Sequence, residues 1–405
     1  MKILLANAWH DKNIGDSALV LSALALLKRK YPNAAITVLS MIPDNHPFFS
    51  SAHNTIRSKH PDVKLVSSPL PMAFADIELK HIWRLLVSFI SVFIPGLLRF
   101  SCFHKIVKQH DLVVGVGGHY LFTINENTKS LFRLLRLTEV FSVAAQKSIP
   151  VCLFSQSLGP YKGRLANKVM KRLFASCRII VREQLSMDIV NRLVINADVH
   201  VKPDSAFYFS ESEQESIDFD EYGKYCVLTL REPMKGDIER VRKDYLATMK
   251  EVAITLLQQK RVEKVIIFPH VKGPTQLEDD QQICRQLHQQ CDNPDVILLD
   301  GPVDIDRSLV LYRKAEFTIG TRFHSVVFAL CQNTPSVAIA YFGPKAQGIM
   351  QYIGMADLCL DINGFSVDDM LLKLDSALSD VNRSALPAIN RKLTKELTQI
   401  DFYDA

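Results

Sequence analysis

The chain has 405 residues, of which 48% are hydrophobic and 22% are charged. That is long for one hydrophobic core and suits two domains of roughly 200 residues each, and the apolar content argues against a disordered protein. The net charge of +5 is spread along the chain with no basic block. Nucleic acid is therefore not an expected partner, whereas a small anionic substrate or an anionic membrane surface is compatible with this charge.

The cysteines and the N-terminus both indicate a cytoplasmic protein. The eight cysteines form no Cys-x-x-Cys pair and lie mostly in apolar runs, so we interpret them as buried free thiols rather than as a disulfide framework or a metal site. Residues 1–7 are apolar over too short a run for a signal peptide and predict a buried strand instead.

The first half of the chain alternates apolar strands with helices, which is typical of a parallel sheet covered on both faces. Residues 43–71 lack this pattern and are interpreted as a loop. The expected strands are 2–6, 35–39, 150–155, 178–181 and 199–201, with one more that starts at 111 and ends in a glycine turn, and the expected helices are 17–30, 131–147, 164–175 and 185–193.

The apolar run 85–98 is the one candidate for membrane contact. Its fourteen residues fall short of the roughly 20 that a spanning helix needs. Basic residues flank the run on both sides, as in helices that lie on a membrane surface. The sequence leaves two interpretations open: peripheral contact with the inner membrane surface, or a core or lid helix of the first domain.

An acidic stretch separates two halves of the chain. Residues 210–222 are rich in Asp and Glu and poor in large apolar residues, so we interpret them as a linker between domains 1–209 and 223–405. The strand and helix alternation then restarts, and it predicts an α/β fold of two Rossmann-like domains that face each other across a cleft. The expected second-half strands are 225–230, 265–268, 296–299, 317–319 and 336–340, and the expected helices are 238–259, 277–291, 307–314 and one that follows Gly320.

Residues 317–330 read as a short buried strand, a glycine break and an amphipathic helix whose first turn carries Arg322, His324 and Ser325. A helix start offers unpaired N–H donors and a partial positive charge, so this junction predicts a site for a phosphate or carboxylate. The histidine adds a group that can transfer a proton beside the bound anion. The alternative is a helix-terminal histidine whose hydrogen bonds are satisfied within the protein.

A second arginine is expected at the same edge of the sheet. Arg231 follows the first strand of the second half and Arg322 follows a later one, and the carboxyl ends of parallel strands point to one edge. Two guanidinium groups suit a ligand that carries both a carboxylate and a phosphate. Separate ion pairs with Glu232 and Glu316 are the alternative.

These motifs, taken in chain order, resemble those of the polysaccharide pyruvyl transferase family. They extend over about residues 13–345, and their order makes the set more specific than any one motif. The resemblance rests on Asn13-Ile14-Gly15-Asp16, Val114-Gly115-Val116-Gly117-Gly118, Gln156-Ser157-Leu158-Gly159-Pro160, Arg182-Glu183-Gln184-Leu185-Ser186, Pro203-Asp204, and Gly320-Thr321-Arg322-Phe323-His324-Ser325 with Tyr341 and Lys345.

The resemblance implies a GT-B-like fold and the transfer of the enolpyruvyl unit of phosphoenolpyruvate to two hydroxyls of a sugar, which forms a cyclic ketal and releases phosphate. It implies that Arg231 and Arg322 hold the anionic groups of phosphoenolpyruvate and that His324 protonates its methylene carbon. It also places Ser325, Tyr341 and Lys345 in the phosphoenolpyruvate site.

The sugar acceptor, free or lipid-linked, is expected on the first half. The candidate residues are Trp9, Asn13, Asp16, Gly117, Gly118 and Glu183, with Asp16 as the group that accepts a hydroxyl proton. Five of the six have a structural alternative: Asp16 as a helix N-cap, Trp9 as ordinary packing, the two glycines as a tight turn, and Glu183, like the lesser candidate His270, in a structural role.

No metal and no cofactor are expected, with phosphoenolpyruvate as a co-substrate. The two Asp-x-Asp patterns, at 218–220 and 304–306, fall in the linker and at a helix start, and neither is predicted to bind a catalytic metal. Two other functions stay open: a nucleotide-sugar-dependent GT-B glycosyltransferase, and a non-catalytic glycan- or phosphate-binding protein of the same fold.

Overall fold

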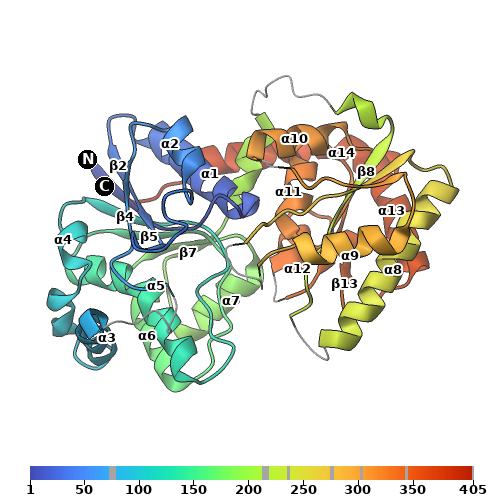
Figure 1. The fold of residues 1–405 in the computed structure, drawn as a ribbon. Helices are drawn as coiled ribbons and strands as arrows, with labels where there is room; N and C mark the ends of the chain where they lie inside the picture. The colour runs from blue at the N-terminus through green and yellow to red at the C-terminus, as the bar shows by residue number, and fades with distance from the viewer. Residues whose placement is uncertain are drawn as a thin grey trace. The chain divides into compact units, whose positions relative to one another are not determined.

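The computed structural model describes residues 1–72, 79–211, 219–234, 238–273, 278–301, 304–342 and 345–403, and it shows an α/β protein built on two parallel sheets (Figure 1). The chain divides into two compact units. The first unit holds residues 1–11, 19–205 and 399–405, and the second holds 12–18 and 206–398. The short segment 12–18 therefore belongs with the second unit although it lies near the N-terminus.

The first unit contains, within the described residues, a seven-stranded sheet in the order β3-β2-β1-β4-β5-β6-β7. All neighbouring strands are parallel, as the alternation of strands and helices predicts. The strands are β1 (Lys2–Ala8), β2 (Ala35–Ser40), β3 (Lys64–Val66), β4 (Leu112–Gly115), β5 (Val151–Gln156), β6 (Arg178–Val181) and β7 (Val199–Val201). β1, β4 and β5 are buried along almost their whole length, as expected of central parallel strands.

Helices cover both faces of this sheet (Figure 1). They are α1 (Ile14–Lys30), α2 (Asn54–Lys59), α3 (Leu79–Ser91), α4 (His104–Val107), α5 (Thr128–Gln146), α6 (Arg164–Phe174) and α7 (Gln184–Leu193), with the 3-10 helix η2 (Pro95–Phe100) after α3. The core is formed by aliphatic strand residues and by the buried side of α5 and α6, with Phe141, Phe174 and Leu153 fully enclosed.

The second unit contains, again within the described residues, a six-stranded parallel sheet in the order β10-β9-β8-β11-β12-β13. This is the strand order of a Rossmann fold, with the reversal between β8 and β11. The strands are β8 (Tyr225–Thr229), β9 (Lys264–Ile267), β10 (Val296–Leu298), β11 (Thr318–Gly320), β12 (Ser336–Ala340) and β13 (Cys359–Asp361), and the helices are α8 (Ile238–Gln258), α9 (Gln281–Cys291), α10 (Ile305–Lys314), α11 (Phe323–Cys331), α12 (Lys345–Tyr352), α13 (Val367–Leu378) and α14 (Asp380–Thr398).

Three sequence-based expectations differ from the structure. Residues 43–71 contain α2 and the edge strand β3, which pairs with β2 over only three residues and so leaves no clear pattern. The strand β13 was not predicted, because it too is only three residues long and leaves no clear pattern in the sequence. The helix α11 is buried on every side rather than amphipathic, because it lies against β11 and β12 and is covered by α10 and α14.

The predicted linker lies largely outside the described residues. Its described end begins at Phe219, which is buried and stacks on Tyr222, while Asp220 forms an ion pair of 2.6 Å with Lys314. The two units divide between Ser205 and Ala206. The role of 210–222 as a linker stays a prediction.

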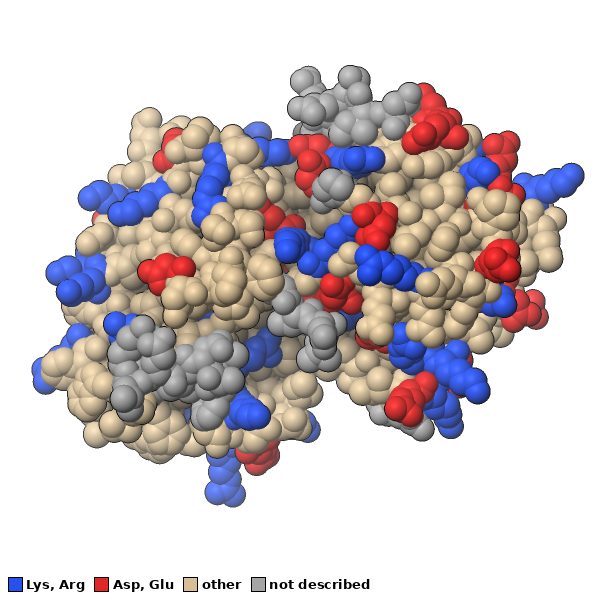
Figure 2. All heavy atoms as spheres, viewed as in Figure 1, with Lys and Arg blue, Asp and Glu red and all other residues tan. Residues whose placement is uncertain are grey.

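The cysteine prediction is confirmed: all eight are free thiols, and six of them are buried. Within the described part of the chain, none of the helices has the length and apolar character needed to cross a bilayer. Figure 2 shows basic and acidic side chains interspersed over the visible face, without a continuous basic stripe on the described part of that face.

Candidate active site

Four predicted side chains lie at the carboxyl ends of adjacent strands in the second unit. His270 comes shortly after β9, Arg231 after β8, Arg322 after β11 and Tyr341 directly after β12. Because β9, β8, β11 and β12 are consecutive in the sheet, these side chains meet at one edge, which is where open α/β sheets bind ligands.

Arg231 is held by Tyr341. Its Nη1 donates a hydrogen bond of 2.7 Å to the Tyr341 hydroxyl, and its guanidinium carbon lies 4.4 Å from the centre of the same ring. Its Nη2 contacts the Met234 sulfur at 3.1 Å, and its buried Nε has no acceptor among the described residues. Burial lowers the pKa of Arg231, and the nearby positive charge of Arg322 lowers it further. The arginine nevertheless stays charged, so this edge of the sheet holds a half-buried cation whose buried Nε has no acceptor among the described residues.

Arg322 is held by Asp280. Its Nε lies 2.9 and 2.8 Å from the two carboxylate oxygens and its Nη2 lies 2.7 Å from Oδ1, while Nη2 also donates to the Glu278 carbonyl. Both side chains are almost fully buried. Burial alone would lower the pKa of Arg322, but the Asp280 carboxylate outweighs burial and raises that pKa above its usual value. Nη1 has no acceptor among the described residues.

The ion pairs proposed from sequence as alternatives are wrong. Arg322 pairs with Asp280 rather than with Glu316. Glu232, the suggested partner of Arg231, pairs instead with Arg242 at 2.6 Å. Asp280 lies 42 residues before Arg322 in the chain, so no local pattern identified it.

His324 lies in the first turn of α11, where Gly15 packs directly against its ring. A β-carbon built on Gly15 would lie 2.1 Å from Nδ1 and 2.5 Å from Cγ of His324. Only a residue without a side chain can occupy position 15 while the imidazole keeps this orientation. His324 as a whole residue is 7% exposed, and its Nε2 is buried.

The junction between β11 and α11 depends on Gly320. A β-carbon there would lie 2.5 Å from the Ser325 hydroxyl oxygen. Ser325 itself is fully buried, and its hydroxyl donates a hydrogen bond of 2.6 Å to the Arg322 carbonyl. The Thr229 hydroxyl oxygen lies 2.7 Å from the Ser325 hydroxyl oxygen. The structure therefore places Ser325 behind Arg322, where it fixes the helix start, and its contact with phosphoenolpyruvate stays a prediction.

Two residues predicted for the acceptor belong to the second unit. Asn13 forms an isolated antiparallel β-bridge with Val271, and the Lys272 amide donates a hydrogen bond of 3.0 Å to the Lys12 carbonyl. Asn13 precedes α1 and its side-chain oxygen accepts from the Asp16 amide at 3.3 Å, while its amide nitrogen donates 2.7 Å to the Asp16 carboxylate. The N-cap is thus Asn13, so the suggestion that Asp16 caps the helix is wrong: Asp16 lies in the first turn of α1.

His270 lies near three positively charged or titratable side chains, His324, Arg322 and Lys345. Burial lowers the pKa of His270 well below its usual range, and the charges of His324, Arg322 and Lys345 lower it further. The ring lies among Phe268, Tyr312 and Phe328, and its Nε2 has no partner among the described residues. His270 is therefore a neutral imidazole. Lys345 begins α12, with its Nζ 5.9 Å from the centre of the Phe323 ring.

The other acceptor candidates lie in the first unit, after strands of the first sheet. Trp9 follows β1, is half-buried and lies 6.5 Å from the His10 ring. Gly117 and Gly118 follow β4, and a β-carbon on Gly117 would lie 2.9 Å from the Ser155 carbonyl oxygen. Position 117 requires glycine because two backbone segments approach closely there, and position 118 favours glycine because its φ is +147°.

Glu183 lies in a buried polar network. Its carboxylate accepts hydrogen bonds from Ser157 (3.0 Å) and from Ser186, while the adjacent Arg182 donates to Ser157 (2.8 Å) and Asp204 (2.7 Å). Burial raises the pKa of Glu183 to about 7, although the Arg182 guanidinium acts in the opposite direction. The motifs around 157, 182–186 and 204 thus form one structural assembly, and Glu183 has no exposed surface for a sugar.

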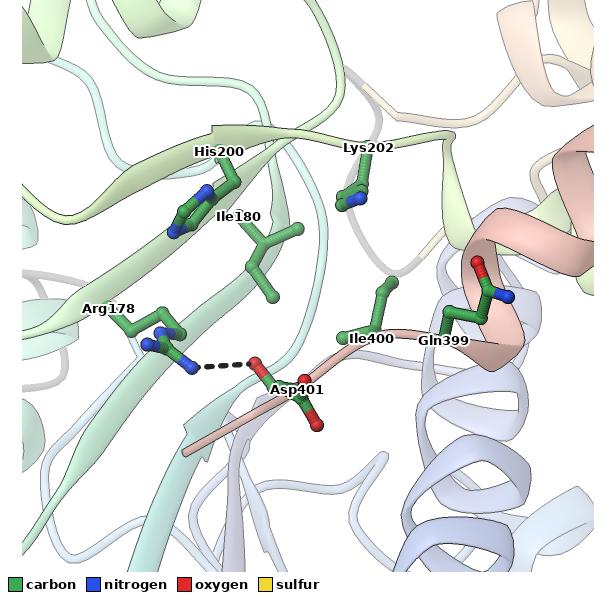
Figure 3. Close-up of a pocket in the computed structure, with 7 residues that line it drawn as sticks. All are labelled: Arg178, Ile180, His200, Lys202, Gln399, Ile400 and Asp401. Atoms are coloured by element: carbon green, nitrogen blue, oxygen red, sulfur yellow. Dashed lines mark hydrogen bonds between the residues drawn. The ribbon is translucent and has the colours of Figure 1, made fainter. Parts of the chain in front are cut away.

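A hollow of about 260 Å³ lies elsewhere in the first unit, between β6, β7 and the last residues of the chain (Figure 3). Arg178 donates 3.3 Å to the Asp401 carbonyl across it, and Asp198 binds both Arg178 and His200. It contains none of the predicted site residues. Because none of the predicted site residues lines this hollow, we place the candidate active site at the second sheet instead.

The Asp-x-Asp patterns have structural contacts where they are described. Asp304 is the N-cap of α10 and accepts from the Arg307 amide at 2.9 Å, and Asp220 pairs with Lys314. Among the described residues, no group of three or more His, Cys, Asp or Glu is arranged to hold a metal ion.

Comparison with known proteins decides the family. The family model for polysaccharide pyruvyl transferase matches residues 13–343, a range that includes Asn13, Arg231, Arg322 and His324. The chain belongs to the polysaccharide pyruvyl transferase family. A relative among known proteins is the amylovoran biosynthesis protein AmsJ of Erwinia amylovora, which is 21% identical over 399 residues, covering 94% of this chain and 92% of AmsJ.

Solved structures share the fold of this pyruvyl transferase family member. A UDP-GlcNAc 2-epimerase from Methanocaldococcus jannaschii superposes with a TM-score of 0.55 at 11% identity, covering 98% of this chain and 100% of that one. The glycotransferase of kitacinnamycin superposes with a TM-score of 0.51 at 10% identity, covering 98% and 95%. At this identity the likeness concerns the GT-B-like fold alone.

Proposed function

We propose that this protein transfers the enolpyruvyl group of phosphoenolpyruvate to two hydroxyls of a sugar in a polysaccharide or its lipid-linked precursor, which yields a cyclic pyruvate ketal and phosphate. Membership of the pyruvyl transferase family supports the reaction class. The amylovoran biosynthesis relative supports polysaccharide synthesis as its setting.

The observation that carries this proposal is the pair of arginines that follow two adjacent strands, the half-buried Arg231 after β8 and the buried Arg322 after β11. Arg231 Nε has no acceptor in the part of the chain that the structure describes, and Arg322 is fixed by Asp280 through Nε and Nη2, which leaves Nη1 for a ligand. The positive charge of Arg322 is close enough to lower the pKa of Arg231, and two neighbouring positive charges favour a ligand with two anionic groups. Phosphoenolpyruvate carries a carboxylate and a phosphate.

The reaction that we propose begins with a proton from His324 to the methylene carbon of phosphoenolpyruvate. The sugar hydroxyl then adds to the neighbouring carbon and loses its proton, and the bond from that carbon to the phosphate oxygen breaks to release phosphate. A second hydroxyl adds to the same carbon and loses its proton, which closes the ketal. Donor and diol thus give ketal and phosphate, a balance that calls for no cofactor.

Gly15 and Asp16 support the assignment of acid and base. Gly15 packs on the His324 ring, and Asp16 follows it in the first turn of α1, oriented by Asn13. The proposed proton donor, His324, and the proposed proton acceptor, Asp16, thus lie on two segments of the second unit that touch each other through Gly15. Trp9, Gly117, Gly118 and Glu183 stay predictions for the acceptor, and burial makes Glu183 the weakest of them.

The proposal is tested by incubating the protein with phosphoenolpyruvate and a panel of simple hexosides with free hydroxyls, and by measuring phosphate release and ketal formation. Binding of phosphoenolpyruvate, measured by calorimetry without a sugar, gives a readout that does not depend on the acceptor. We expect binding that is lost in Arg231→Ala. Consumption of a nucleotide sugar with no binding of phosphoenolpyruvate would contradict the proposal and favour a glycosyltransferase.

A further inference from the structure

The helix α3 and the turn after it expose an unusual amount of apolar side chain. Ile82, Trp83, Leu86, Phe89, Phe93, Ile94 and Phe100 are between 42% and 65% exposed, and we call these seven residues the α3 face. Positions 82, 86 and 89 follow helical spacing on α3, and Phe93, in the turn after the helix, contacts the Phe89 ring with 6.0 Å between ring centres. Trp83 is one of only two tryptophans in the chain and is the most exposed member of the face.

The buried side of α3 carries two serines beside Val87, whereas its described aromatic residues are exposed. Ser88 and Ser91 lie on its buried side, where Ser88 donates a hydrogen bond to Glu139 of α5. Arg172 of α6 donates to the carbonyls of Ser91 (3.3 Å) and Val92 (3.0 Å). A helix that only covered a core would turn its aromatic residues inward and its serines outward.

Basic residues border the α3 face. Lys168 of α6, which lies beside α3 (Figure 1), places its Nζ 4.8 Å from the centre of the Phe93 ring, and Arg99 lies 4.7 Å from the centre of the Phe100 ring. Lys105 and Lys108 are exposed just beyond. Residues 79–108 include no Asp or Glu, and neither does α6.

We propose that the α3 face docks this protein on the surface of an anionic phospholipid bilayer. An apolar face with aromatic residues and a basic border is the pattern of a helix that lies in the membrane interface. α3 has 13 residues, too few for the roughly 20 that span a bilayer, so it inserts parallel to the surface. A second copy of this chain is a poorer occupant, because a two-fold contact would bring the two basic borders together.

Vesicle sedimentation with the full-length protein tests this inference, which does not depend on the proposed reaction. One set of vesicles contains phosphatidylglycerol and phosphatidylcholine, and the other contains phosphatidylcholine alone. Trp83→Ser with Phe89→Ser removes two members of the face, and Lys168→Glu reverses one border charge. The matched control, Leu372→Ser with Val381→Ser, removes two side chains that are 66% and 78% exposed in the second unit.

We expect binding to the anionic vesicles that weakens with salt. The double variant at 83 and 89 should bind about tenfold less tightly or worse, since two buried aromatic side chains are lost. Lys168→Glu changes the charge by two units and should weaken binding by about fivefold for each unit. The control should bind as the wild type does. In a Trp9→Phe background, the fluorescence of Trp83 should shift to the blue on binding.

Three results would overturn the inference: no binding to anionic vesicles at low salt, equal loss in the control variant, or a wild-type dimer in sedimentation that the 83 and 89 variant abolishes. The last would assign the α3 face to a second copy of the chain. Because phosphoenolpyruvate binding is measured in the absence of lipid, failure of this inference is distinguishable from failure of the proposed reaction.

Discussion

A β-carbon on Gly15 would lie 2.1 Å from Nδ1 of His324. The two residues are more than 300 positions apart in the chain, yet both belong to the second unit. The Asn13–Asp16 motif near the N-terminus therefore fixes the orientation of the proposed acid in the C-terminal half.

Gly15→Ala should impair turnover without unfolding the protein. The added methyl group displaces the imidazole, whereas alanine is well tolerated in a helical turn. Because positioned proton transfer is typically worth about a hundred- to ten-thousand-fold in rate, we expect kcat for phosphate release to fall by at least about a hundredfold, with a nearly unchanged melting temperature. Gly364→Ala is the control, because a β-carbon there meets no atom within 4 Å.

Arg231→Lys should weaken phosphoenolpyruvate binding although it keeps the charge. Arg231 donates to the Tyr341 hydroxyl through Nη1 and holds Nε at a separate position. The single nitrogen of lysine cannot occupy both positions and lacks the planar fork that binds a carboxylate or phosphate through two donors. A hydrogen bond to a charged group contributes about 1.5–3 kcal/mol, so we expect calorimetric affinity to fall by about ten- to a hundredfold. Tyr341→Phe, which keeps the ring under the guanidinium, should have a smaller effect. Equal affinity in Arg231→Lys would remove Arg231 from the site.

Asp280→Ala should destabilise the second unit. It leaves the Arg322 guanidinium buried without its carboxylate and also removes an acceptor for the Val271 amide. Breaking a buried ion pair costs about 3–5 kcal/mol, which urea unfolding would detect. The matched control is Asp300→Ala, whose partly exposed carboxylate pairs with Arg285 and Lys272 and should cost less than about 1 kcal/mol. Similar losses in both variants would contradict the account of Arg322.

Glu183 should make stability fall as the pH rises. Its pKa is raised by burial from 4.5 to about 7, so the folded state holds a proton that the unfolded state releases. The free energy of unfolding therefore decreases by up to about 3 kcal/mol between about pH 4.5 and pH 7 because of this group. Above about pH 7 the contribution of Glu183 no longer changes with pH. Glu183→Gln, measured by urea unfolding across that range, should show a flatter profile. An unchanged slope would mean that Glu183 is ionised in the folded protein.

The sequence was sufficient for those features of the site that follow from strand order. Arg231, Arg322 and Tyr341 each come within two residues of the end of a β-strand, and parallel strands bring such positions to one edge. The glycine break at 320 was also readable, and the structure supplies its reason in the close approach of Ser325.

Other features depend on contacts between distant segments. Asp280 lies in a polar stretch before α9 with no motif around it, and its role follows only from its contact with Arg322. The segment 12–18 joins the second unit through its pairing with Val271 and Lys272, which a local pattern does not encode. The burial of α11 likewise follows from its neighbours α10 and α14.

Phosphate release from phosphoenolpyruvate by His324→Gln, compared with the wild type and with binding measured in parallel, tests the central claim most directly. The account predicts that the variant binds phosphoenolpyruvate within a few-fold of the wild type and releases phosphate at least about a hundredfold more slowly. Release at the wild-type rate would contradict it, because the proposed reaction then has no proton donor at the site.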